Sequence, residues 1–147
     1  MTSISLPDVL LSAAQKAGCR DQARLRHTLD DATDKRQPLI EALHARGFSI
    51  AVETNGTLAA PEGLDWICVS PKAQAPVVQQ SGQELKLVFP QTDVDPARFE
   101  GWDFARFLLQ PMDGPDRIAN TEAAIAYCLA HPRWRLGLQT HKVTGLP

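Results

Sequence analysis

Apolar and polar positions alternate along the chain in blocks that predict strands separated by helices or turns. The short apolar runs predict five strands, at Phe48–Val52, Trp66–Val69, Glu84–Phe89, Phe104–Leu109 and Trp134–Leu138. Strands that alternate with helical or turn segments favour an α/β fold with a mostly parallel sheet. Because the runs are short and mostly apolar, the strands are expected to be buried on both faces.

Apolar residues at helical spacing predict three helices, at Ser5–Gly18, Pro38–Arg46 and Asn120–Ala130. Pro38 is expected at the start of the second helix, and Asn120 or Thr121 is expected to cap the third. Two further segments have weaker patterns. The pattern of Ala73–Gly82 predicts at most one short helix. The pattern of Pro96–Trp102 predicts a short helix or a turn.

The segment from Arg20 to Arg36 is dense in charge, with five basic and four acidic residues in seventeen. It contains helix formers but little apolar stripe, so it is interpreted as a solvated helix or loop. A phosphate-binding patch is the alternative. Residues 1–37 are therefore treated as a helical and charged N-terminal segment of unknown packing, apart from residues 38–147.

Polar and small residues follow four of the predicted strands, at Glu53–Gly56, Ser70–Lys72, Gln110–Gly114 and Gln139–Lys142. In a parallel sheet the carboxyl ends of the strands lie at one edge, where loops converge and ligands bind. The mixture of charges and neutral hydrogen-bonding groups suits a polar, zwitterionic or heteroaromatic small molecule. Plainer interpretations stand beside this one. Asn55 and Asp113 are ordinary turn residues, and His141 alone can be structural. Lys72 can equally be a surface lysine.

Composition narrows the class of protein. The chain has 147 residues, 44% of them hydrophobic and 22% charged, which is ordinary for one globular domain. A net charge of −2 gives no electrostatic reason to expect nucleic-acid binding. No apolar run reaches the ~18 residues of a membrane span, and no signal-peptide pattern is present. Cys19, Cys68 and Cys128 are widely spaced and form no metal motif, so a reduced, cytoplasmic chain is expected.

The segment from Pro38 to Pro147 resembles a known enzyme family. The stretches PLIEALHARGFSIAVETNGTLAAPEGLDWICVSPKA, ELKLVFPQ, FLLQPMDGPD and NTEAAIAYCLAHPRWRLGLQTHKVTGLP are similar to 7-carboxy-7-deazaguanine synthase. This is a radical S-adenosylmethionine family of 7-deazapurine (queuosine) biosynthesis. The resemblance implies an incomplete (β/α) partial barrel of mostly parallel strands.

The resemblance also implies a reaction and a set of cofactors. The family is a lyase that converts 6-carboxy-5,6,7,8-tetrahydropterin to 7-carboxy-7-deazaguanine with loss of ammonia. It uses S-adenosylmethionine, a [4Fe-4S] cluster and Mg²⁺. A pterin is therefore the implied small-molecule substrate, and a homodimer is compatible with the resemblance.

Site residues follow by position in the matched motifs. The resemblance implies that the cofactor is bound by two segments: Ser70, Pro71 and Lys72, then Gln110, Pro111, Met112 and Asp113. The resemblance places the substrate against His141 and against the terminal carboxylate of Pro147. Glu53, Thr54 and Asn55 lie on the same predicted rim and are weaker candidates.

Part of the family pattern is missing. The CxxxCxxC-type cluster motif, the Asp-Thr pair for Mg²⁺ and the TGGEP segment do not occur in this sequence. No catalytic residue and no metal ligand is therefore assigned, and the chain is expected to be inactive alone. One hypothesis is a radical enzyme whose cluster-binding half is truncated or supplied by another chain. The alternatives are a non-catalytic relic that binds a nucleoside or pterin, and a degenerate product that folds poorly.

Overall fold

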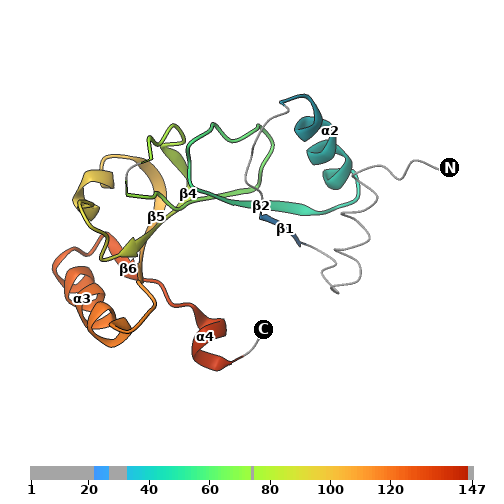
Figure 1. Ribbon diagram of the computed structural model, residues 1–147. Coiled ribbons are helices and arrows are strands. Elements are labelled where there is room, and N and C mark those ends of the chain that lie inside the picture. Colours follow the sequence, from blue (N-terminus) through green and yellow to red (C-terminus); the bar gives the residue numbers. More distant parts are fainter. Residues whose placement is uncertain (1–21, 27–32, 74, 146–147) are drawn as a thin grey trace.

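The computed structural model describes residues 22–26, 33–73 and 75–145, and its centre is one parallel sheet (Figure 1). The sheet has six strands in the order β1-β2-β3-β4-β5-β6, and every neighbouring pair is parallel. The strands are β1 Gln22–Arg26, β2 Ser49–Thr54, β3 Trp66–Val69, β4 Ser81–Phe89, β5 Asp103–Pro111 and β6 Trp134–Leu136. Because β1 and β6 lie at opposite ends of this order, the described strands form an open sheet. The α/β class and the incomplete barrel are confirmed.

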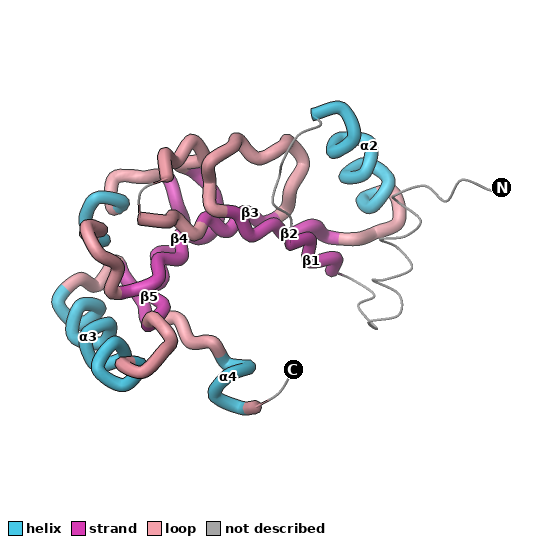
Figure 2. Tube along the Cα trace, viewed as in Figure 1, coloured by secondary structure: helices cyan, strands magenta, loops and turns pink. Residues whose placement is uncertain are grey.

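Helices lie on both sides of the curved sheet. They are α2 Thr33–His44, α3 Arg117–Ala130 and α4 Thr140–Thr144, with a short 3-10 helix, η1, at Pro96–Phe99. Figure 2 shows α2 and α3 on the convex side of the sheet and α4 on the concave side. No helix among the described residues is long and apolar enough to cross a membrane.

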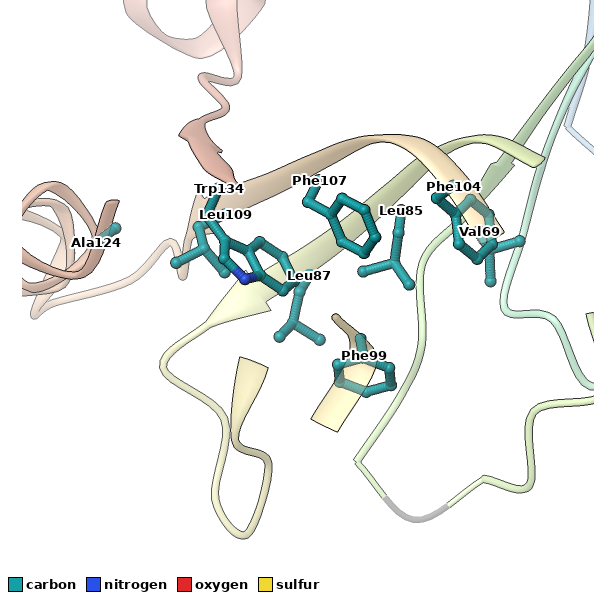
Figure 3. Packing of buried hydrophobic residues seen from close by; sticks show 9 residues of the cluster. All are labelled: Val69, Leu85, Leu87, Phe99, Phe104, Phe107, Leu109, Ala124 and Trp134. Carbon is teal, nitrogen blue, oxygen red and sulfur yellow. The ribbon is translucent and has the colours of Figure 1, made fainter. Parts of the chain in front are cut away.

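The main hydrophobic core fills the convex side, between the sheet, η1 and α3. Its buried members are Val69, Leu85, Leu87, Phe99, Phe104, Phe107, Leu109, Ala124 and Trp134 (Figure 3). Trp134 is only 2% exposed, and its indole N–H donates a hydrogen bond of 3.0 Å to a carboxylate oxygen of Glu100. A smaller cluster of Ile40, Leu43 and Ile50 joins α2 to β2. Burial of these apolar side chains holds the helices to the convex face.

The concave face is different, and here the expectation of burial on both faces is wrong. Along β4, Leu85 and Leu87 are buried, whereas Glu84 and Lys86, which alternate with them, are only partly buried. Successive side chains of a strand point to opposite faces, so β4 presents apolar groups to the core and charged groups to the concave side. The sheet therefore has one buried face and one polar face.

Several predicted boundaries in the N-terminal half also need correction. The segment interpreted as a solvated helix or loop contains strand β1, which pairs in parallel with β2. Helix α2 begins at Thr33, so Pro38 lies inside it rather than at its start. Pro38 removes one helical N–H, but burial of Ile40 and Leu43 offsets that loss. The helix predicted at Ser5–Gly18 lies outside the described residues.

The remaining corrections concern the C-terminal half. The described residues of Ala73–Gly82 contain no helix, and β4 already begins at Ser81. Helix α3 starts at Arg117, and neither Asn120 nor Thr121 caps it, since both side chains donate to carbonyls, of Met112 and Arg117 respectively. Strand β6 stops at Leu136, and α4 was not predicted.

Gly56 is required by the turn that follows β2. Its φ is +78°, and a Cβ atom there would lie 2.7 Å from Val69 Cγ1 and 2.8 Å from Val77 Cγ1. Its carbonyl accepts the backbone N–H groups of Val78 and Gln79 at 2.8 and 3.0 Å. The turn therefore holds the end of β2 against the segment that leads into β4.

Replacing Gly56 with alanine combines a left-handed backbone with a steric clash, so the expected loss of unfolding free energy is about 3 kcal/mol. Gly47 is a matched control, because it has the same φ of +78° but no atom lies within 4 Å of the position that a new methyl group would take. Gly47→Ala should cost only about 1 kcal/mol, the backbone part alone. Urea unfolding of both variants measures the difference, and equal losses would contradict the steric account.

Asp65 joins α2, β2 and the start of β3. One of its carboxylate oxygens accepts the Ile50 N–H at 2.7 Å and lies 2.9 Å from His44 Nε2. The Ile50 N–H, followed by His44, lowers the pKa of Asp65 below its usual 3.8. A lowered folded-state pKa means that this contribution to stability is present above about pH 4 and is lost as the pH falls through the lowered value.

Asp65→Asn should therefore destabilise the protein at pH 7, and its deficit relative to the wild type should shrink toward pH 3. Unfolding free energies of the two proteins at both pH values test this. If Asp65→Asn lowers the free energy of unfolding equally at pH 3 and pH 7, the ionised carboxylate of Asp65 is not the source of the stabilisation.

Candidate functional site

The carboxyl ends of the strands meet at one edge of the parallel sheet, as predicted. β2 ends at Thr54, β3 at Val69 and β5 at Pro111, so the clusters of Glu53–Gly56, Ser70–Lys72 and Gln110–Gly114 all lie at this carboxyl edge. The fourth cluster differs, because Gln139–Lys142 leads into α4 rather than directly ending a strand. The edge therefore combines three strand ends with one short helix.

Ser70 and Lys72 form a pair at the end of β3. Ser70 is a buried polar residue, 5% exposed, and its backbone N–H donates to the Thr54 carbonyl at 2.7 Å. Lys72 is exposed, and its ammonium donates to the Ser70 hydroxyl oxygen at 3.3 Å. That oxygen accepts from lysine, so the serine O–H can still donate to a ligand. Pro71 is buried between them.

The second cluster continues from β5. Gln110 is half-buried and stands opposite Val88 in the sheet register. Pro111 is buried, while Met112 and Asp113 are exposed. The Met112 N–H donates to the Phe89 carbonyl at 2.7 Å, and its own carbonyl accepts the Asn120 side-chain amide at 3.0 Å. The backbone leading to Asp113 is thus fixed from both β4 and α3.

Asp113 has a partner within the chain. One of its carboxylate oxygens lies 2.5 Å from the ammonium of Lys142 in α4. The hydrogen bond and the charge of Lys142 hold the pKa of Asp113 below its usual value. The Asp113 carboxylate is therefore ionised at neutral pH and already engaged.

A cavity of about 390 Å³ adjoins this pair. It lies between the end of β5, the first turns of α3 and the segment that enters α4. Its walls are formed by Pro111, Asp113, Arg117, Ile118, Thr121, Glu122, Leu138, Gln139 and Lys142. Apolar groups and charged groups both line it, which suits a small molecule with apolar and polar parts.

The Ser70–Lys72 and Gln110–Asp113 clusters lie at the same edge of the sheet, but no hydrogen bond or ion pair among the described residues joins them directly. β4 lies between β3 and β5, so Lys72 and Gln110 are separated by two strand spacings, roughly 10 Å. A ligand that touches both must be elongated, with a polar group at each end. The backbone of His141 lies in α4, its side chain is not described, and Pro147 lies outside the described residues.

The Glu53–Gly56 cluster divides into turn residues and one residue of the concave face. The Thr54 hydroxyl accepts the Gly56 N–H at 3.1 Å, and the Asn55 side-chain oxygen accepts the backbone N–H and hydroxyl of Thr57 at 3.1 and 2.9 Å. These oxygens shape the turn, in line with the plainer interpretation of this segment. Glu53 instead pairs with Lys86 on β4, with 2.6 Å between their charged atoms.

The charged residues of β4 and β5 on the concave face were missed by the sequence analysis. Besides the Glu53–Lys86 pair, the Cys68 thiol lies 3.4 Å from a carboxylate oxygen of Glu84. On the same face the Arg106 guanidinium stacks 5.0 Å from the centre of the Trp66 ring. The alternation of Glu84-Leu85-Lys86-Leu87 was the available signal, because a period of two marks a strand with one polar face.

The described cysteines do not fit an iron–sulfur cluster. Such a cluster is held by several thiolates that converge on it. Cys68 lies on the concave side beside Glu84, whereas Cys128 packs against the core on the convex side. Burial, followed by the charge of Glu84, raises the pKa of Cys68 to about 12, and burial also raises the pKa of Cys128. Cys19 lies outside the described residues, within which no group of three or more metal-binding side chains occurs.

Cys68 should accordingly be unreactive in the folded protein. A pKa near 12 reduces its thiolate population at pH 8 by about a thousandfold relative to an ordinary thiol of pKa 9.0. Iodoacetamide labelling followed by peptide mass spectrometry should show Cys68 modified at least a hundredfold more slowly in the native chain than in urea. Rapid native labelling would contradict the buried, protonated thiol.

These features define an α/β partial barrel whose candidate ligand site lies at the carboxyl edge. No protein-family model matches the chain. The chain is 71% identical over 119 residues to 7-carboxy-7-deazaguanine synthase of Caulobacter vibrioides, which covers 81% of this chain and 54% of that protein. It is 60% identical over 111 residues to the Bordetella pertussis protein of the same name, covering 76% and 53%.

A more distant relative has the same name. The Bacteroides thetaiotaomicron 7-carboxy-7-deazaguanine synthase is 36% identical over 118 residues, covering 80% of this chain and 58% of that protein. The chain therefore spans about half the length of the curated relatives that it matches. The resemblance found in the sequence is confirmed as a match to a segment of these proteins.

Proposed function

We propose that this chain binds S-adenosylmethionine at the carboxyl edge, in the manner implied by its similarity to 7-carboxy-7-deazaguanine synthase. The observation that supports this most strongly is the Ser70–Lys72 pair, in which a buried hydroxyl and an exposed ammonium stand together at a strand end. An ammonium attracts the carboxylate of an amino acid, and a hydroxyl can serve its polar groups. The family resemblance implies this ligand, and the Ser70–Lys72 pair offers chemistry that suits it.

The two-strand separation of the clusters suits this elongated ligand. Lys72 and Ser70 would bind the methionine end, and the Gln110 amide would bind polar groups of the nucleoside end across β4. Buried Pro71 and Pro111 fix the backbone beside these side chains, with Met112 exposed at the rim. His141 and the terminal carboxylate of Pro147 would contact a pterin, because a carboxylate can accept two parallel N–H bonds from an aminopyrimidinone edge.

This chain alone is not proposed to catalyse the family reaction. The family reaction needs a [4Fe-4S] cluster and Mg²⁺, and Cys68 and Cys128 lie on opposite faces of the sheet. We therefore propose that conversion of 6-carboxy-5,6,7,8-tetrahydropterin requires cluster ligands from outside the described residues. Binding and orientation of the two small molecules is what these residues are equipped to do.

The placement of the cysteines also favours a second candidate function, a non-catalytic module that binds a nucleoside or pterin. The two candidates differ in what happens after anaerobic iron–sulfide reconstitution of this chain together with a chain that carries the CxxxCxxC-type motif. A radical enzyme would gain cluster absorbance and release 5′-deoxyadenosine from S-adenosylmethionine under reducing conditions. A binding module would retain ligand affinity and release none.

Calorimetric titration with S-adenosylmethionine tests the binding proposal. Lys72→Ala should weaken affinity by about 10- to 100-fold, the value of one charge-assisted hydrogen bond, while Lys72→Arg should retain part of it. Arg46→Ala is the charge-matched control, since Arg46 precedes β2 at the opposite edge of the sheet and its guanidinium donates to the Ala42 carbonyl near the end of α2. No binding by the wild type, or equal binding by Lys72→Ala, would refute the proposal.

A further inference from the structure

Helix α4 is joined to the sheet by a short connection. Within the described residues, the last backbone hydrogen bond from this part of the chain to the sheet runs from Gly137 N–H to the Leu109 carbonyl, at 2.7 Å. Leu138 beyond it is 58% exposed, and α4 itself has five residues. Among the described side chains, the ion pair of Lys142 with Asp113 ties α4 to the body of the protein.

Asp113 is a firm anchor for that interaction. It follows β5 closely, and the preceding residue, Met112, is held by hydrogen bonds to both Phe89 and Asn120. The Lys142 ammonium donates to a carboxylate oxygen of Asp113, and both side chains are partly exposed, at 41% and 43%. Both side chains also form part of the wall of the 390 Å³ cavity, so the pair joins its two sides.

We infer that Asp113 is a positioning residue, which acts through Lys142 to fix α4 over the carboxyl edge rather than contacting the cofactor itself. This rests on the proposed function, in which α4 carries a substrate contact, His141. Lys142 is the neighbour of His141 in the sequence, so anchoring one residue fixes the backbone of the other.

The length of chain between anchored residues shows how far His141 could move without the ion pair. With the pair intact, His141 is one residue, roughly 4 Å, from an anchored point. Without it, the nearest anchored backbone is Gly137, and four residues can span roughly 14 Å. An exposed ion pair adds little to global stability, so its loss should change the position of α4 and leave the fold intact.

The first test needs no ligand. Backbone ¹⁵N heteronuclear NOE values for residues 139–145 should fall in Asp113→Asn and in Lys142→Gln, and the charge-swapped double variant D113K/K142D should restore them. Asp116→Asn is the control. Asp116 lies three residues after Asp113, and its own carboxylate makes no side-chain cap bond to α3. Unchanged NOE values in Asp113→Asn would overturn the inference.

The second test separates positioning from direct contact. In Asp113→Asn, affinity for 6-carboxypterin should fall roughly five- to tenfold, while affinity for S-adenosylmethionine should stay within twofold. Loss of S-adenosylmethionine affinity with unchanged 6-carboxypterin affinity would overturn the inference and make Asp113 a cofactor contact. If the wild type binds neither compound, the proposed function fails, and the NOE comparison still decides whether Lys142 and Asp113 anchor α4.

Discussion

The parallel pairing of β4 with β5 is the interaction on which the rest of this structure depends. The two strands stay in register from Ser81 opposite Asp103 to Phe89 opposite Pro111, the longest pairing among the described strands. On the convex side this register stacks Leu85 on Phe107 and Leu87 on Leu109, which are the centre of the core. At its carboxyl end this pairing places Gln110 and the backbone before Asp113 at the carboxyl edge of the sheet. A shift by one residue would exchange the apolar and polar faces.

That register also explains why the protein can combine a stable core with a polar concave face. The convex face is covered by α2, α3 and η1, whereas the concave face carries the Glu53–Lys86 pair and the Arg106–Trp66 stack. Charged side chains beneath a covering layer would lose hydration, so they are tolerated where each has a partner and partial exposure. A sheet of this kind can present charges to a small molecule without weakening its own packing.

Sequence patterns predicted the features that depend on local periodicity and strand order. All five predicted strands overlap observed ones, and the parallel arrangement followed from their alternation with helices and turns. The carboxyl-edge position of Ser70–Lys72 and Gln110–Asp113 followed in turn, because parallel strands end on the same side. Strand β1 was not predictable in the same way, since its QARLR sequence has too few apolar residues to signal a strand and it is paired through its backbone with β2. Contacts between distant residues also escaped the sequence, because Lys142 meets Asp113, and Lys86 meets Glu53, across separations in the chain that no local pattern encodes.

The central claim is that the carboxyl edge of this sheet is a ligand site shared by the ends of β3 and β5. Titration of ¹⁵N-labelled protein with S-adenosylmethionine, followed by amide chemical shifts, tests it most directly. The account predicts saturable shifts at Ser70, Lys72, Gln110 and Met112, with Arg46 and Phe48 at the amino edge of β2 unchanged. Shifts confined to the amino edge or to the convex face, or no saturable shift at all, would contradict it.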